Sequence, residues 1–544
     1  MLKAIELENF KAFGERKRIE FAPITLIFGE NSAGKSSILQ SLNLLKQTRD
    51  SRDSGALILP RTEGGIVDLG SFREMVFDHD LSRNVSIRLD FTSDRELRNR
   101  QVDSADANSD YIGFEVGFNR PSDDIEVQLT DLKFYSAIAG NIASFKPIDV
   151  SAEQLRSMAR DSQMMMRTSR VTRLSDFRAA KCFSLSRDKS LWGEIFERTK
   201  RRSDKIADEL QLLLAEGQES SRQQSLFNDG DDERQAWLAS VADAIRFYNS
   251  EFTSDAFVDR MMRAELETII VLDGFIPLPI RQRESGGLPE LETFRRYGPT
   301  RLRTKELTLD LMSFAVECGR KLDNTLKNIY PMGPYRRPPE RWYILTGTSP
   351  QDVGYRGDQL PDLLFRRPEI VEETNRWLDK LEIGYHINVQ SVGERSRDLF
   401  EVRLLDRRRG STVDVALTDV GFGISQILPF IVQSLAGEKQ TITIEQPEVH
   451  IHPRLQADIG DLLAATIKEP RGHRFVIETH SEHLVLRMQR LVREGTLVPE
   501  DISILYVSRG KNGSHVERLH LDNDGDFIDE WPGGFFPERL RELM

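Results

Sequence analysis

The segment GENSAGKS, from Gly29 to Ser36, has the residue types and the spacing that hold a triphosphate. It fits the pattern G-x-x-x-x-G-K-[ST] and stands between an apolar, strand-like run and an amphipathic, helix-like run. Glycines let backbone N–H groups turn toward phosphate oxygens, and the start of the helix directs its positive end to the same place. Lys35 adds a point charge, and the Ser36 hydroxyl can ligate Mg²⁺. The segment therefore predicts a P-loop that binds ATP and Mg²⁺.

Candidate nucleotide-binding residues surround the two glycines and the lysine of this pattern. The set is Lys11, Gly29, Asn31, Ser32, Ala33, Gly34, Lys35, Ser36 and Ser37. Lys11 follows the first strand-like run and can reach the nucleotide, although a solvated surface lysine explains it equally well.

The segment TITIEQPEVHIHP, from Thr441 to Pro453, presents carboxylates at the end of another strand. Its β-branched residues predict a buried strand, and ligands bind at the carboxyl edge of sheets built from such strands. Glu445 stands at that edge and is the candidate carboxylate ligand of Mg²⁺, together with Ser36. His450 and His452 alternate further on, but no third ligand has a recognisable spacing, so we expect packing and hydrogen-bonding roles for both.

Gln446 occupies the position where an enzyme that hydrolyses nucleotides normally has an acid. An amide can orient a water molecule, but it cannot take a proton from that water at neutral pH. A positioned general base contributes about 10² to 10⁴ in rate, so its loss predicts slow hydrolysis with nucleotide binding retained. Glu448 is close enough in sequence to substitute, and whether its side chain faces the phosphate stays open.

A third strand-like run, RFVIETHSEH, ends at His480. In a sheet of this type that end lies beside the phosphates, where the imidazole can sense or polarise the γ-phosphate. A lone histidine in this place would more often be structural, but the neighbouring motifs favour the nucleotide role. The candidate catalytic residues are therefore Glu445, Gln446, Glu448 and His480.

These side chains require a sheet whose strand ends meet the P-loop. The residues before the P-loop alternate as strands, and from Lys35 apolar residues recur at helical spacing. The sequence predicts an α/β fold in which residues 1–150 form the P-loop lobe and residues 329–544 complete the same head. Between them, residues 151–328 have helical patterns and predict an insertion, with a mobile loop near residues 217–234.

Bulk composition limits the class of protein. The chain has 544 residues, 39% of them hydrophobic and 30% charged, so it can bury a large core. No apolar run approaches the ~18 to 20 residues that cross a bilayer, and no signal-peptide pattern opens the chain, so we expect a cytoplasmic protein without membrane contacts. Its two cysteines suggest neither a disulfide framework nor a zinc site. The formal net charge of -12 argues against a DNA-coating protein, although a regional contact with nucleic acid stays open.

The order of the motifs resembles the ABC-type ATPases related to the SMC proteins, and more closely the OLD-like ATPases of bacterial antiphage defence systems. The resemblance covers both halves of the head. It lies in NFKAF followed by GENSAGKSS, in TIEQPEVHIHP and in THSEH. The segments YPMGPYRRPPERWY and WPGGFFPERLREL are similar to a subgroup that includes Septu-type ATPase subunits.

The resemblance implies an ABC-type head that dimerises around two nucleotides, each P-loop facing a signature segment of the other subunit. Here the candidate signature is DVGFGISQ, and its candidate nucleotide-binding residues are Gly421, Gly423, Ser425 and Gln426. The glycines permit close backbone approach, Ser425 offers a hydroxyl, and the following helix points its amino end at the partner's phosphate. A turn that simply starts a helix is the alternative for so short a glycine pattern.

Two departures from the family pattern affect the expected function. The usual Asp-Glu pair reads Glu445-Gln446, which favours slow hydrolysis and a long-lived ATP-bound dimer. The carboxylate-rich nuclease domain of OLD proteins is not expected in this sequence, and LDNDGD is expected to form a solvated turn instead of a metal site.

The preferred hypothesis is an oligomeric ATPase subunit that hydrolyses ATP slowly and regulates a separate effector, expected to be a nuclease, in antiphage defence. One alternative is a DNA-repair ATPase of the SMC or RecF-like type, but the insertion is short for coiled-coil arms and lacks sustained heptads. Another alternative is a scaffold in which ATP is structural and never hydrolysed.

Overall fold

The computed structural model describes most of the chain outside residues 187–268 and 278–317. The described ranges are 1–51, 57–92, 111–151, 177–186, 269–277, 318–345, 349–392, 398–408 and 413–532, apart from residues 123 and 137–139, with a few single residues elsewhere. The predicted mobile loop at residues 217–234 and most of the predicted helical insertion lie outside these residues, so both stay predictions.

A six-stranded sheet joins the two ends of the chain, and its order is β11-β16-β17-β3-β18-β19. The first five strands are parallel, and β19 is antiparallel to β18. The strands are β3 (Ile24–Gly29), β11 (Ile329–Met332), β16 (Thr441–Glu445), β17 (Arg474–Glu478), β18 (Ile502–Gly510) and β19 (Gly513–Leu519). The P-loop strand β3 therefore lies between strands from the other half of the sequence, and the predicted α/β P-loop fold is confirmed.

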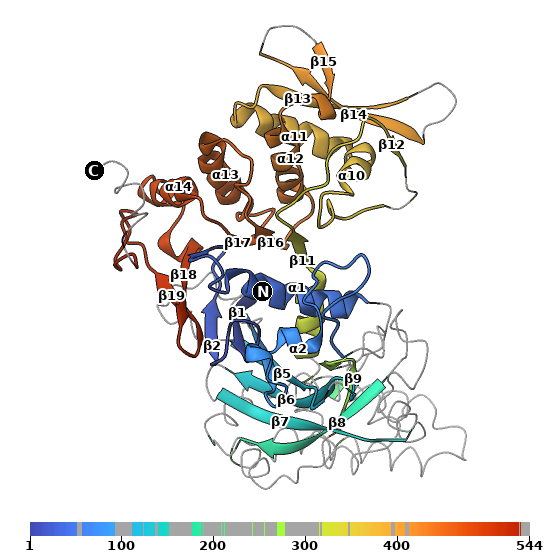
Figure 1. Ribbon diagram of the computed structural model, residues 1–544, viewed down its shortest axis with the longest axis vertical. Helices are drawn as coiled ribbons and strands as arrows, with labels where there is room; N and C mark the ends of the chain where they lie inside the picture. The colour runs from blue at the N-terminus through green and yellow to red at the C-terminus, as the bar shows by residue number, and fades with distance from the viewer. Residues whose placement is uncertain are drawn as a thin grey trace, which may run out of the picture.

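Alternation of side chains along β3 explains how this sheet packs on both faces. Leu26 and Phe28 belong to the core shared with the later helices, whereas Ile27 belongs to the core shared with α1. Figure 1 shows α1 on one side of the sheet and α12 and α13 on the other. The helices α1 (Lys35–Asp50), α12 (Phe422–Leu435) and α13 (Pro453–Thr466) are joined by α14 (Glu482–Arg493), which packs against α13.

A nine-stranded antiparallel sheet lies on the α1 side of the molecule, in the order β10-β9-β8-β7-β6-β5-β4-β1-β2. Its strands are β1 (Leu2–Glu8), β2 (Lys17–Glu20), β4 (Val85–Thr92), β5 (Tyr111–Asn119), β6 (Gln128–Ser136), β7 (Gly140–Ile148), β8 (Phe177–Leu185), β9 (Ile269–Asp273) and β10 (Ile276–Pro277). Strands β8, β9 and β10 come from the range predicted as an insertion, so part of that range extends the sheet of the P-loop lobe.

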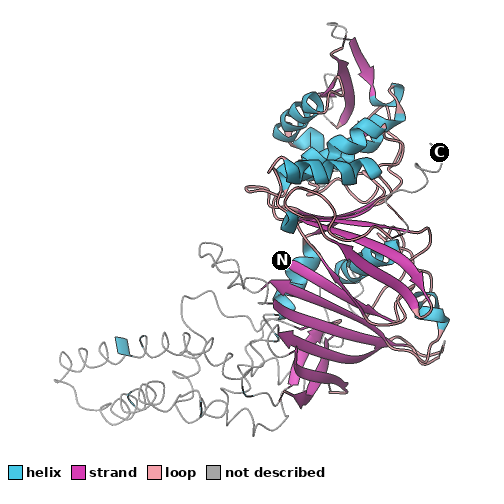
Figure 2. Ribbon diagram, turned by 90° about the vertical axis from the view of Figure 1, so that its left-hand side faces the viewer, coloured by secondary structure: helices cyan, strands magenta, loops and turns pink. Residues whose placement is uncertain are grey.

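A smaller sheet forms the far end of the helical side, as Figure 2 shows above the helices. It contains β12 (Tyr343–Ile344), β13 (Tyr385–Ser391), β14 (Leu399–Asp406) and β15 (Val413–Ala416), and α10 (Leu360–Arg366) and α11 (Pro368–Lys380) pack beside it. The short helices are α2 (Phe72–Met75), η1 (Phe77–His79), η4 (Leu417–Asp419) and η5 (Pro499–Asp501). Within the described ranges, none of the helices combines the length and apolar character needed to cross a bilayer.

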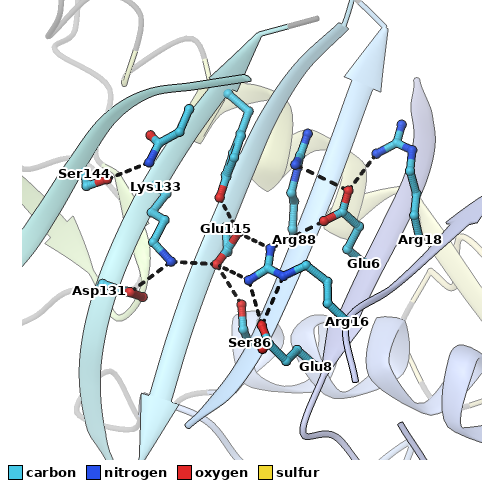
Figure 3. Close-up of polar contacts among 12 residues, drawn as sticks. Glu6, Glu8, Arg16, Arg18, Ser86, Arg88, Glu115, Asp131, Lys133 and Ser144 are labelled. Atoms are coloured by element: carbon cyan, nitrogen blue, oxygen red, sulfur yellow. Dashed lines mark hydrogen bonds and ion pairs between the residues drawn. The ribbon is translucent and has the colours of Figure 1, made fainter. Parts of the chain in front are cut away.

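A row of alternating charges crosses one face of the nine-stranded sheet (Figure 3). The register places Glu6 opposite both Arg18 and Arg88, Arg88 opposite Glu115, and Glu115 opposite Lys133. Glu6 accepts from Arg18 at 3.0 Å, and Glu115 accepts from Lys133 at 2.9 Å. Opposite charges directly across neighbouring strands stabilise a sheet, so this row helps to fix the register of β2, β1, β4, β5 and β6.

Replacing Glu115 with glutamine is expected to lower the free energy of unfolding by about 1 to 3 kcal/mol, because it removes a fully buried carboxylate that two partly exposed cations share. The Glu115 side chain is 0% exposed and accepts from Arg16 at 2.7 Å and from Lys133 at 2.9 Å. Urea denaturation at pH 7 measures the loss. The matched control is Glu8→Gln, because Glu8 also binds Arg16 but has a 36% exposed side chain, and it should cost less than about 1 kcal/mol.

The same replacement has an expected pH dependence. Burial by itself would raise the pKa of Glu115, but hydrogen bonds from Arg16, Tyr135 and Lys133 hold it well below its usual range. A carboxyl group with a lowered pKa stabilises the fold fully above its unfolded pKa of about 4.3, and this contribution disappears as the pH falls toward the folded pKa. The difference in stability between wild type and Glu115→Gln should therefore shrink below about pH 4. An unchanged difference down to pH 2 would contradict this role.

Candidate nucleotide site

The P-loop backbone takes the conformation that its two glycines allow. Gly29 ends β3 with φ 135°, and Gly34 precedes α1 with φ 101°. A Cβ atom at Gly29 would collide with the carbonyl oxygen of Val507, and one at Gly34 would meet Ala12 at 2.7 Å. Because both positions combine a left-handed φ with close neighbours, glycine is required at each of them.

Lys35 lies folded over the loop. Its Nζ atom donates to the carbonyl oxygens of Gly29 at 3.0 Å and Glu30 at 2.6 Å. Burial lowers the pKa of Lys35, and the nearby charges of Glu478 and Glu30 act in the opposite direction. The ammonium group is therefore held by weak carbonyl acceptors that phosphate oxygens can replace at little cost.

A cavity of about 610 Å³ opens beside this loop. Its lining residues are Lys11, Ala12, Ser32, Gly34, Lys35, Ser36, Ser37, Glu74, Val76, Asp78, His79 and Glu478. The structure thus brings six of the predicted nucleotide-binding residues to one cavity, Lys11 among them. Gly29, Asn31 and Ala33 are not among the described lining residues; the Asn31 carbonyl accepts from Arg509 at 3.1 Å, and the Ala33 carbonyl accepts from Ser514 at 2.5 Å. Glu74, Asp78 and His79 also line this cavity. The sequence motifs did not predict them, because they lie in the region of α2 and η1, far from the P-loop in sequence.

Glu478 is the functional candidate that the sequence motifs did not identify. It ends β17 directly beside Glu445, which ends β16 in the same register. Its Oε1 atom accepts from Ser36 Oγ at 3.0 Å, while its Oε2 atom is buried without a partner in the described part of the chain. The segment RFVIETHSEH contains a pattern that could have identified Glu478. It predicts a strand that ends in glutamate, and two parallel strands that both end in glutamate bring two carboxylates together.

These oxygen atoms fit a magnesium ion. Mg²⁺ is usually held by one or two carboxylates and a hydroxyl, with phosphate and water completing its six ligands. Burial and the neighbouring charge of Glu478 raise the pKa of Glu445 to about 7. Burial also raises the pKa of Glu478, against a hydrogen bond from Ser36 and the charge of Lys35. A buried carboxylate whose charge raises the pKa of its neighbour marks a place where a cation is favoured. Within the described residues no cluster of three His, Cys, Asp or Glu side chains offers a site made of protein ligands alone, LDNDGD included.

Glu448 connects the end of β16 to the loop that carries His480. Its Oε2 atom accepts from Thr479 Oγ1 at 2.7 Å, and its Oε1 atom accepts from the His480 backbone N–H at 2.7 Å. Burial raises the pKa of Glu448, while these two hydrogen bonds oppose the shift. Partial burial and the charge of Lys35 lower the pKa of His480, which favours the neutral form of its ring. Glu448 is thus a fixed carboxylate beside His480, the residue predicted to sense or polarise the γ-phosphate.

Gln446 has a different environment from Glu448. It follows β16 with a left-handed φ of 46°, and its backbone N–H donates to the Glu478 carbonyl at 2.7 Å. Its side chain is half-buried, beside two carboxylates that end neighbouring strands. Gln446 and Glu448 are therefore separate candidates for the residue that contacts the attacking water.

The DVGFGISQ segment forms the amino end of α12, with Gly421 at the N-cap. Ser425 Oγ donates to the Phe422 carbonyl at 2.7 Å, and Gln426 is buried with its Nε2 atom unpartnered among the described residues. A Cβ atom at Gly423 would lie 2.9 Å from the His450 carbonyl oxygen, so this glycine lets α12 approach the β16 segment. None of the four predicted signature residues lines the P-loop cavity of the same chain, as far as the described residues show.

The two histidines that were expected to pack or form hydrogen bonds have such contacts. The His450 ring packs edge-on against Phe422, with ring centroids 5.1 Å apart. His452 accepts from the Arg454 backbone N–H at 3.3 Å and caps α13.

Comparisons with known proteins agree with the P-loop geometry. A family model described as AAA ATPase domain (AAA_15) matches residues 1–227 and 366–485. A second model, described as a protein of unknown function (DUF3696), matches residues 497–544. No curated protein matches the chain.

Two solved structures that are similar over most of the chain are SMC head domains. The SMC head domain from Thermotoga maritima is 11% identical, with 95% of this chain and 98% of that chain covered and a TM-score of 0.35. The Smc head domain from Pyrococcus furiosus, bound to the C-terminal domain of ScpA, is 12% identical, with 95% and 96% covered and a TM-score of 0.35. Because the AAA ATPase domain model matches more than half of the chain, the protein belongs to this ATPase family.

Proposed function

We propose that the protein binds ATP and Mg²⁺ at the P-loop and hydrolyses ATP slowly. The observation that carries this proposal is the hydrogen bond between Ser36 and Glu478. Glu445 ends the neighbouring strand opposite Glu478, and the Lys35 ammonium group binds the carbonyl of Gly29 in the same loop. It supplies, around one cavity, a lysine for the outer phosphates and oxygen ligands for the metal.

The residues that would hold Mg²⁺ are Ser36, Glu445 and Glu478. When bound, the ion supplies positive charge to the phosphate oxygens and to the leaving group. The chain's own residues then divide the remaining work. Lys35 exchanges its carbonyl acceptors for phosphate oxygens, and the neutral imidazole of His480 stays able to accept or donate a hydrogen bond to the terminal phosphate.

Slow hydrolysis follows from the residues that face the attacking water. Gln446 can orient this water but cannot take its proton. Glu448 is the proton acceptor in our proposal, because it is a half-buried carboxylate fixed beside His480 by two hydrogen bonds. Those bonds occupy both carboxylate oxygens and leave Glu448 less free to contact the water, so we expect turnover below that of an ATPase with a free glutamate.

The proposed assembly is a dimer in which the amino end of α12 in one subunit contacts the nucleotide of the other. Support comes from the signature-like segment, whose glycines and Ser425 stand at a helix start but outside the P-loop cavity of their own chain. Phe422 in this segment is 49% exposed, so the face that would meet a second subunit includes an accessible aromatic ring. We further propose, from the resemblance of the motifs to OLD-like and Septu-type ATPases, that the ATP-bound dimer regulates a separate nuclease effector in antiphage defence.

Single-turnover measurement of phosphate release tests the ATPase proposal. Protein in excess over radiolabelled ATP with Mg²⁺ should release phosphate in one slow phase, and Lys35→Ala should lose ATP binding and with it the release. Binding without any release over many hours would identify a scaffold that only holds ATP. If Lys35→Ala bound ATP as wild type does, the proposed site itself would be wrong. Co-purification with the products of neighbouring genes tests the effector.

A further inference from the structure

Arg336 lies at the same sheet edge as the proposed metal ligands, but one strand further from the P-loop. It follows β11, which pairs in parallel with β16 so that Met332 lies opposite Ile444. The chain then continues through Gly333 and Pro334 to Arg336, past the point where β16 ends in Glu445. The sheet order therefore places an arginine beside the carboxylates that face the nucleotide.

The Arg336 guanidinium is buried without matching acceptors. Arg336 is 4% exposed, and its Nε and Nη2 atoms have no hydrogen-bond partner in the described part of the chain. Nη1 has only a long contact, 3.4 Å, to the Pro334 carbonyl. A buried charge with free N–H groups is costly, so such a group is retained where a ligand satisfies it.

The carboxylates whose charges reach Arg336 are already bound to other groups. Glu448 accepts from Thr479 and from the His480 backbone, and Glu445 accepts from the Tyr355 hydroxyl at 3.3 Å. Arg336 thus neutralises part of this acidic edge without an ion pair to any residue that the structure describes there. Its planar N–H fork stays available for an anion with several oxygens, which is the geometry that phosphate offers.

Two chain segments that form hydrogen bonds with each other hold the backbone around Arg336 in place. The Gly333 N–H donates to the Tyr355 carbonyl at 2.9 Å, and the Arg337 N–H donates to the Arg356 carbonyl at 2.7 Å. Gly357 lies close to both Arg336 and α12. A Cβ atom at Gly357 would lie 3.0 Å from Pro429 of α12 and 3.9 Å from Arg336 Cγ. The arginine is therefore fixed between the sheet edge and the helix that begins with the signature segment.

We propose that Arg336 binds the terminal phosphate of the nucleoside triphosphate, as a phosphate ligand outside the P-loop. The proposal rests on the nucleotide site proposed above and adds to it a residue that distinguishes a triphosphate from a diphosphate. The ligand chemistry is a phosphate oxygen group, either covalently part of the nucleotide or free after hydrolysis.

Affinities for a triphosphate and a diphosphate, measured side by side, test this proposal. Arg336→Met removes the fork while filling the buried space, and Arg336→Lys keeps the charge. Calorimetry with Mg²⁺ and adenylyl imidodiphosphate should show a dissociation constant raised about 10- to 100-fold in Arg336→Met, with an unchanged dissociation constant for ADP. Arg336→Lys should recover only part of the loss, because lysine lacks the planar fork.

Two results would overturn the proposal. Equal weakening of the triphosphate and diphosphate complexes would identify a structural role, and unchanged affinity for both would show that no phosphate reaches Arg336. Adding inorganic phosphate to the ADP complex distinguishes the two sources of the anion: stabilisation in wild type but not in Arg336→Met shows that free phosphate also uses this site. Wild-type protein that binds neither nucleotide would instead refute the nucleotide site itself, and Lys35→Ala, which should weaken both complexes, provides the reference.

Discussion

Replacing Glu448 with glutamine is expected to lower single-turnover phosphate release by about 10² to 10⁴, while ATP binding stays within a few-fold of wild type. The amide has nearly the same shape as the carboxylate. Its oxygen can still accept the His480 N–H, and its NH₂ group can donate to the Thr479 hydroxyl oxygen, so the loop keeps its contacts. What the substitution removes is the ability to take a proton from water. Quenched mixing of excess enzyme with labelled ATP measures the rate directly.

A pH profile and a second variant separate a proton acceptor from a support for the loop. If Glu448 takes the proton, release by wild type should fall at low pH around a midpoint above the ordinary glutamate pKa, because burial raises the pKa of Glu448. Glu448→Gln should lose this midpoint. Thr479→Val removes one hydrogen bond but keeps the carboxylate, so its rate should fall less than about 10-fold. A fall as large as that of Glu448→Gln would show that the loop contact, and not the base, controls the rate.

The parts of the site that lie within one continuous segment were predictable from sequence. The P-loop is such a segment, since two glycines, a lysine and a serine stand between a strand and a helix at fixed spacing. Glu445 was predictable for a similar reason, because a β-branched run ends at it and parallel strands present their carboxyl ends to ligands. The spacing of residues along the sequence is enough to predict a ligand-binding site when one continuous segment carries all of its ligands.

Glu478 and Arg336 required the order of the strands. Glu478 ends its strand and Arg336 lies in the segment that follows β11, and neither belongs to a spacing pattern that names a ligand. They reach the site only because β17 lies between β16 and β3, and because β11 adds to the other side of β16. Strand order is set by helices that pack on both faces of the sheet and by long connections, and a single sequence does not record it. The charge row on the larger sheet escaped prediction for the same reason, since the register of five strands creates it.

Introducing a glutamate at Gln446 is expected to raise single-turnover hydrolysis by about 10-fold, less than the whole effect of a general base, because Glu448 already supplies a proton acceptor. The new side chain has the length of the old one and can bind the same water, but it can also take its proton. The measurement is the rate of phosphate release at saturating ATP and Mg²⁺, with ATP affinity determined in parallel. A fall in rate with normal affinity would show that a third acidic side chain beside Glu445 and Glu478 repels the phosphate instead of activating water.

The double variant Gln446→Glu with Glu448→Gln decides which of the two positions carries the proton. Activity that returns to the level of Gln446→Glu alone would place the base at residue 446 and leave Glu448 as the residue that holds the His480 loop. Activity as low as that of Glu448→Gln alone would show that water is deprotonated only from position 448. Because both substitutions exchange a carboxylate and an amide of equal size, the double variant keeps the net charge of the site. Electrostatic effects on metal binding are therefore matched to wild type, and the remaining difference in rate reports the location of the base.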